Sequence, residues 1–224
     1  MPSAEPESPV TTRKLVAWLL LVGALALLSY SARAAGGKPS RDVLYKYSFA
    51  IGGLIEYAIL LGIVLAIARG LSRGTLGLKR PRSWARAAGL MLGLLVLVVI
   101  AEQVLEPFLH AAREQGLEPT RWESDHAFAF ALNAVVVVVV APIVEELTFR
   151  GLGFAVLLPY GPAVAVIGTA VAFAAVHGLV EGFVPLLLFA LAIGFLRLRT
   201  ESVYPGMIFH GCFNAAALAL VFLS

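Results

Sequence analysis

Three short segments of this sequence place ionisable and hydrogen-bonding side chains within long apolar runs. They are Glu145-Glu146-Leu147-Thr148-Phe149-Arg150, Phe173-Ala174-Ala175-Val176-His177 and His210-Gly211-Cys212-Phe213-Asn214. Such side chains cost several kcal/mol at bilayer depth unless they face a partner or a wet cavity. We therefore predict that their polar members converge on one site, formed by Glu145, Glu146, Arg150, His177, His210 and Asn214.

The spacing of the glutamate pair predicts different roles for its two carboxylates. Residues four apart share a helix face, so Glu146 and Arg150 are expected to form an ion pair. Glu145 points about 100° away from that face, which leaves its carboxylate free to act as a general base. The alternative is a charge cluster at the membrane interface without chemistry, because long polar side chains often reach toward water.

The two histidines and the asparagine are expected to complete the site. Glu145 and His177 lie at similar sequence distances from the turn signal at 159–162, so an antiparallel helix hairpin would bring them to the same depth. His210 and Asn214 lie four apart on one face of the last helix, and both can donate hydrogen bonds to an oxyanion. Simple counting places His210 at a shallower depth than His177.

The elements that must position these residues are transmembrane helices. Of the 224 residues, 60% are hydrophobic and only 14% are charged, against about 25% charged in an average soluble domain. The apolar runs cover about 15–32, 47–68, 84–104, 127 to the turn at 159–162, a fifth ending at 177, 184–198 and 203–223. Runs near 20 residues predict spanning helices. The expected fold is all-α, a polytopic bundle of about seven or eight helices around a membrane-embedded catalytic cavity.

The chain is expected to be one transmembrane domain. Residues 1–13 are polar and predicted to be disordered, 14–224 form the domain, and its catalytic core covers about 127–223. The first run is either a retained helix, which we favour, or a cleaved signal peptide. The pI near 9.2 does not indicate nucleic-acid binding, because the basic residues gather in loops beside apolar runs.

Loop charges predict the orientation in the membrane. The basic residues between the second and third runs predict a cytoplasmic loop and a cytoplasmic amino terminus. That cluster consists of Arg69, Arg73, Lys79, Arg80, Arg82 and Arg86. The basic residues of the first loop contradict this assignment, and they are Arg33, Lys38, Arg41 and Lys46.

In this order, the three segments resemble the motifs of the CPBP family of intramembrane proteases, which includes the CAAX prenyl endopeptidases and the bacteriocin-processing or Abi proteins. The family pattern is Glu-Glu-x-x-x-Arg, Phe-x-x-x-His and His-x-x-x-Asn/Asp, and every fixed position is matched, including Phe173. The resemblance implies hydrolysis of a peptide bond in a membrane-associated protein or peptide. It implies Glu145 as general base, His177 positioning the water, His210 and Asn214 as oxyanion hole, and Glu146 with Arg150 shaping the site or contacting substrate.

Several alternatives remain open at this point. Glu145, His177 and His210 would be the ligands if the protein were a zinc enzyme, although a metal-free glutamate mechanism is favoured and no cofactor is expected. A membrane binding or immunity protein without proteolytic activity is the main alternative function, and a transporter is a weaker one because no inverted repeat is visible. The alanine-, leucine- and arginine-rich composition suggests a multi-pass protein of a bacterial inner membrane.

Two further residues are notable. Glu56 lies near the middle of the second apolar run, where it is either functional or paired with a basic residue. Pro142 precedes the glutamate pair by one turn and is expected to free backbone groups near the site.

Overall fold

The computed structural model describes residues 12–36, 42–109, 114 and 122–219, and within these ranges it is helical, with no strand. The main helices are α1 (Thr12–Ala34), α2 (Tyr47–Ile67), α3 (Trp84–Leu109), α8 (Pro162–Val176), α9 (Phe183–Thr200) and α10 (Tyr204–Ala219). Residues 1–11, most of the segment predicted to be disordered, lie outside the described ranges, and α1 already begins at Thr12.

The fourth predicted run is one continuous helical rod, Ser124–Tyr160, whose winding changes along its length. It consists of α5 (Ala127–Val135), a π-helical segment (Val136–Val140), α6 (Ala141–Glu146), a second π-helical segment (Leu147–Gly153) and α7 (Phe154–Leu157), between short 3₁₀ turns at Ser124–His126 and Leu158–Tyr160. The apolar profile predicted the rod, but it did not predict the two π-helical segments that bracket the glutamate pair.

Within the described residues, five helices are long and apolar enough to cross a membrane: α1, α2, α3, the rod and α9. Helix α8 is apolar but shorter. Large apolar side chains such as Leu20, Ile59 and Leu92 are exposed on the outer faces of α1, α2 and α3, as expected of surfaces that contact lipid. The all-helical membrane fold is therefore confirmed at this level.

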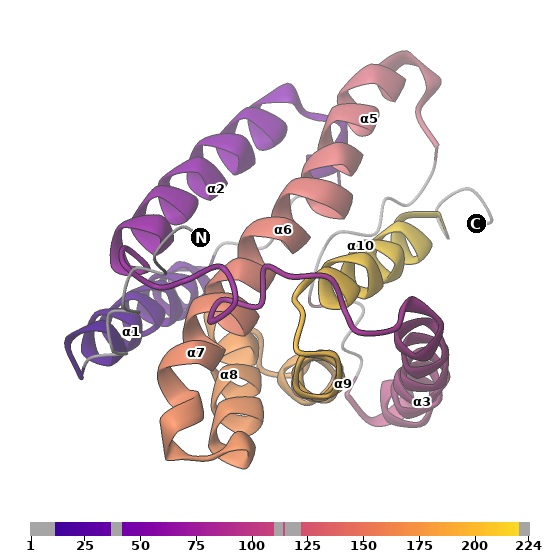
Figure 1. Ribbon diagram of the computed structural model, residues 1–224. Helices are drawn as coiled ribbons and strands as arrows, with labels where there is room; N and C mark the ends of the chain where they lie inside the picture. The colour runs from indigo at the N-terminus through magenta and orange to yellow at the C-terminus, as the bar shows by residue number, and fades with distance from the viewer. Residues whose placement is uncertain (1–11, 37–41, 110–113, 115–121, 220–224) are drawn as a thin grey trace.

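The rod forms the centre of the bundle. Figure 1 shows α6 near the middle, with α1 and α2 on one side and α10, α9 and α3 on the other. Helix α8 packs against α9, and α10 packs against α6 and the first π-helical segment. Their contacts bury a single large core that includes Phe149, Phe173, Phe189, Ile193 and Phe209.

Helix α1 is packed into this core through one large side chain. Trp18 is 1% exposed, and its Nε1 donates a hydrogen bond to the carbonyl of Thr148 at 3.0 Å. The indole occupies the space beside Gly153, where a Cβ would lie 2.5 Å from Trp18 Cζ2. Trp18 thus ties α1 to the second π-helical segment of the rod.

The two ends of the bundle differ in how their charges are paired. At one end the α2–α3 loop, which crosses in front of the rod in Figure 1, docks on the α9–α10 turn through Lys79 and Arg82 to Glu201, at 2.8 and 3.2 Å. At the other end Arg33 forms an ion pair with Glu114. The predicted basic cluster therefore lies at the same end as Arg197 and Arg199, while Arg33, which contradicted the orientation, is neutralised by an acidic partner. Which end is cytoplasmic remains a prediction.

Candidate active site

Near the glutamate pair, Pro142 leaves one backbone carbonyl without its helical donor, and Asn214 supplies the missing hydrogen bond. In a π-helix the carbonyl of residue 137 would accept from the amide of residue 142, but proline has no N–H to donate. The side-chain Nδ2 of Asn214 donates to this carbonyl of Val137 instead, at 2.8 Å. Helix α10 can approach so closely because Gly211 has no side chain, and a Cβ there would lie 2.7 Å from the carbonyl oxygen of Val138.

Glu146 and Arg150 form the ion pair that their spacing predicted, and both are fully buried. Glu146 Oε1 accepts from Arg150 Nη1 at 3.1 Å, and Arg150 Nη2 donates to the carbonyl of Ala190 at 2.7 Å. The guanidinium also lies over the ring of Phe173, with Cζ 4.8 Å from the ring centroid. These contacts compensate both charges where water is absent.

The same glutamate holds His210. The Nδ1 atom of His210 lies 3.2 Å from Glu146 Oε1, and because a carboxylate only accepts, this ring nitrogen carries the proton. The imidazole is wedged edge-on between Phe173 and Phe189, with ring centroids 5.7 and 5.1 Å away. Its other nitrogen, Nε2, thereby points toward Glu145, 3.8 Å from Oε2.

Helix packing brings His210 to the level of the glutamates, so the depth expected from simple counting is wrong. Counting residues from the α9–α10 turn assumed an upright helix, whereas α10 packs directly against α6 and the π-helical segment. His210 contacts both carboxylates as a result.

Glu145 has one oxygen in a hydrogen bond and one without. Tyr57 donates its hydroxyl to Glu145 Oε1 at 2.6 Å, whereas Oε2 lies beyond hydrogen-bond distance of His210. The side chain is 14% exposed and lines a cavity. The Glu145 carboxylate is therefore partly exposed to the cavity, whereas that of Glu146 is fully buried. The helical geometry predicted this difference.

His177 caps the end of α8 with a defined ring orientation. Its Nδ1 lies 2.7 Å from the carbonyl of Phe173, so Nδ1 is the donor and Nε2 of the neutral ring is left as an acceptor. The ring packs against that of Phe173, with the centroids 4.6 Å apart. His177 lines the same cavity as Glu145, which agrees with the hairpin expectation.

The cavity has a volume of about 590 Å³ and collects four of the six predicted residues: Glu145, His177, His210 and Asn214. Its walls are largely apolar, with Phe49, Val136, Val137, Leu186, Phe189, Phe213 and Leu218 among its lining residues. Glu146 and Arg150 do not line it. They lie behind His210 and fix its orientation, so the described geometry gives them no direct access to a substrate.

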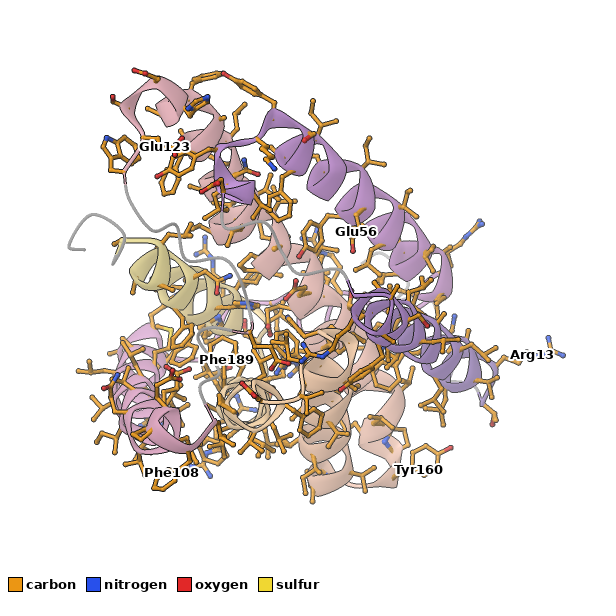
Figure 2. The ribbon with its side chains drawn as sticks, turned by 180° about the vertical axis from the view of Figure 1, so that it is seen from behind. Arg13, Glu56, Phe108, Glu123, Tyr160 and Phe189 are labelled. Atoms are coloured by element: carbon orange, nitrogen blue, oxygen red, sulfur yellow. The ribbon has the colours of Figure 1, made fainter. Side chains whose placement is uncertain are left out.

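Four polar lining residues were not part of the predicted site: Ser48, Glu56, Tyr57 and Glu102. Glu56 points from α2 toward the central helices in Figure 2, and within the described part of the chain it has no basic partner. The position of Glu56 in the middle of an apolar run was the sequence signal that marked it as a candidate. Nothing in the sequence distinguished Tyr57 from the other aromatic residues of the apolar runs.

The proposed zinc ligands do not form a ready metal site. Among the described residues, no group of three or more His, Cys, Asp or Glu side chains is arranged to hold a metal ion. The Nδ1 atoms of His177 and His210 are engaged by a carbonyl and a carboxylate, which leaves Nε2 of each ring as the atom that could bind a metal ion. The metal-free mechanism therefore stays a prediction.

Comparison with known proteins identifies the region that carries the site. Residues 127–216 match the family model described as type II CAAX prenyl endopeptidase Rce1-like. No curated protein and no solved structure matches the chain. The matched residues include all three motifs, and the match agrees with the resemblance to the CPBP proteases.

Proposed function

We propose that this protein is an intramembrane endopeptidase that hydrolyses a peptide bond with a water activated by Glu145. The match of residues 127–216 to a protease family supports a hydrolase, and several apolar helices support a multi-pass membrane protein. The observation that carries the proposal is the cavity in which Glu145, His177, His210 and Asn214 meet.

The attacking water would lie between Glu145 Oε2 and His177 Nε2, the two acceptors that their other hydrogen bonds leave open. Glu145 removes one proton from the water while the oxygen attacks the scissile carbonyl carbon. Collapse of the tetrahedral intermediate breaks the C–N bond, and Glu145 returns the proton to the departing nitrogen. The products are a free carboxylate and a free amine.

The developing oxyanion would be stabilised by Asn214 and His210. The amide nitrogen of Asn214 has two N–H groups, and one is used on Val137, so the second is available to the cavity. His210 holds its Nδ1 against Glu146 and directs Nε2 toward the Glu145 side of the ring, and Nε2 would donate to the oxyanion when it carries a proton. Glu146 and Arg150 would act by holding this ring in place.

The apolar walls suit a substrate that is itself an apolar, membrane-tethered protein or peptide. Leader peptides, carboxyl-terminal sorting tails and anti-sigma-type membrane proteins are candidate substrates, and a bacterial inner membrane is the proposed location. We propose that no metal is required. A binding or immunity protein of the same fold is the second candidate function, but a binder has no use for a partly open carboxylate among such donors.

The test is cleavage of a panel of membrane-anchored peptides by the purified full chain in detergent. Glu145→Gln should abolish cleavage, because the amide cannot accept a proton from water, and EDTA should leave the wild type active. Glu201→Gln, which alters an exposed glutamate outside the cavity, is the matched control and should cleave normally. Cleavage that survives Glu145→Gln would refute the base, and loss with EDTA followed by rescue with zinc would establish a metalloenzyme.

A further inference from the structure

Helix α2 lies outside the family-matched region, yet it contributes to the site through one face. The α2 positions that are not exposed follow a helical stripe: Ala50, Gly53, Tyr57, Leu60, Leu61, Val64 and Ile67. Their spacing of three and four residues puts them on a single side of the helix. This side packs against α5, α6 and both π-helical segments of the rod, so Tyr57 is directed at the glutamate pair.

A glycine sets the distance between α2 and the rod at this point. A Cβ on Gly53 would lie 3.1 Å from Val136 Cγ1, closer than ordinary van der Waals contact. Gly53 precedes Tyr57 by one helical turn and shares its face. The absence of a side chain at Gly53 therefore helps to keep the Tyr57 hydroxyl within reach of Glu145.

The hydrogen bond from Tyr57 to Glu145 is short. The distance from its hydroxyl oxygen to Glu145 Oε1 is 2.6 Å, within the range of about 2.5–2.7 Å typical of O–H···O⁻ bonds. In the described part of the chain no other hydrogen-bond donor to Oε1 is recorded. Without this bond the carboxyl group could rotate, because its terminal torsion has a broad energy profile.

We propose that Tyr57 is a positioning residue that fixes the Glu145 carboxylate with Oε1 occupied and Oε2 facing the cavity. Its catalytic consequence rests on the proposed function, since it matters only if Glu145 activates water. A complete site then needs α2 in addition to the family-matched region. The hydroxyl carries this role, while the phenyl ring supplies the packing in the α2 stripe.

The contact is tested without any substrate by infrared spectroscopy of the purified full chain. The difference spectrum of wild type minus Glu145→Gln isolates the carboxylate stretching bands of Glu145. We expect Tyr57→Phe to shift these bands, because a carboxylate oxygen loses its donor. The matched control is Tyr30→Phe, which removes a hydroxyl that donates to the carbonyl of Leu179 and should leave the bands unchanged. Unchanged bands in Tyr57→Phe would overturn the proposal.

Turnover of a cleaved peptide then tests the catalytic consequence. Tyr57→Phe should lower kcat about tenfold to a hundredfold, the value of one hydrogen bond to a charged group, with KM changed less than about twofold because the ring remains in place. A band shift with an unchanged kcat would overturn the positioning role. A band shift in a protein whose wild type cleaves no peptide would leave the contact supported and count against the proposed function alone.

Discussion

The buried pair of Glu146 and Arg150 makes a quantitative prediction about stability. Arg150→Met removes the guanidinium and leaves Glu146 with His210 Nδ1 on Oε1 and no hydrogen-bond partner on Oε2. Both side chains are 0% exposed, so water cannot replace the lost contact. Removing one partner of such a pair costs about 3–5 kcal/mol. For a chain of this size that corresponds to a loss of roughly 10 °C in Tm.

A second variant separates charge from packing. Adding Glu146→Gln to Arg150→Met removes the unpaired negative charge of Glu146, while the amide oxygen of the glutamine can still accept a hydrogen bond from His210. Most of the lost stability should therefore return, because neutral replacement of a buried pair is often nearly neutral in free energy. Restored stability in the double variant would show that the loss in Arg150→Met comes from charge.

Thermal unfolding in detergent, followed by size-exclusion chromatography of heated samples, measures both effects. Arg82→Met is the matched control, since this guanidinium is 87% exposed and exposed pairs contribute only about 0–1 kcal/mol. The reasoning is refuted if Arg150→Met melts with the wild type, or if the double variant is no more stable than the single one.

Three further changes have defined outcomes. Gly211→Ala should cost about 1–3 kcal/mol and lower turnover, because a Cβ would displace α10 from Val138; Gly93→Ala, with open space around it, should do neither in the same melting and cleavage assays. Glu56→Gln should weaken by about threefold to tenfold any preference for peptides with lysine near the scissile bond, because the described cavity lining contains glutamates but no lysine or arginine; equal preference in both proteins would contradict this. The hydrogen bond and charge of Lys79, with Arg82, hold the pKa of Glu201 below its ordinary value. The ionised Glu201 side chain therefore stabilises the fold at neutral pH, and this stabilisation is lost as pH falls through the lowered pKa. The Tm of Glu201→Gln should differ from that of the wild type at pH 7 and converge with it at acid pH.

Much of the site could be predicted because helical spacing is local. The pairing of Glu146 with Arg150 follows from four residues of separation, and the placement of His177 beside Glu145 follows from a hairpin around one turn. The hydrophobic runs likewise predicted the helices, because apolar length is set by bilayer thickness. Both kinds of prediction use only residues close in sequence and the thickness of the surrounding bilayer.

The remaining features depend on how helices pack, which the sequence does not specify locally. The run of six valines from Val135 to Val140 gives no sign that Val136–Val140 is π-helical, and only Pro142 indicated an irregularity nearby. The level of His210 could not be obtained from simple counting, because it depends on how α10 packs against the rod, where Gly211 lies against Val138. Tyr57 was missed because its partner Glu145 lies 88 residues away on another helix.

The packing of Trp18 has a consequence for the order in which the protein is made. The hydrogen bond from its indole reaches Thr148, 130 residues further along the chain. The surface beside Gly153 that receives the indole exists only once the rod has been synthesised and folded. Docking of α1 is therefore a late event in the folding of the chain.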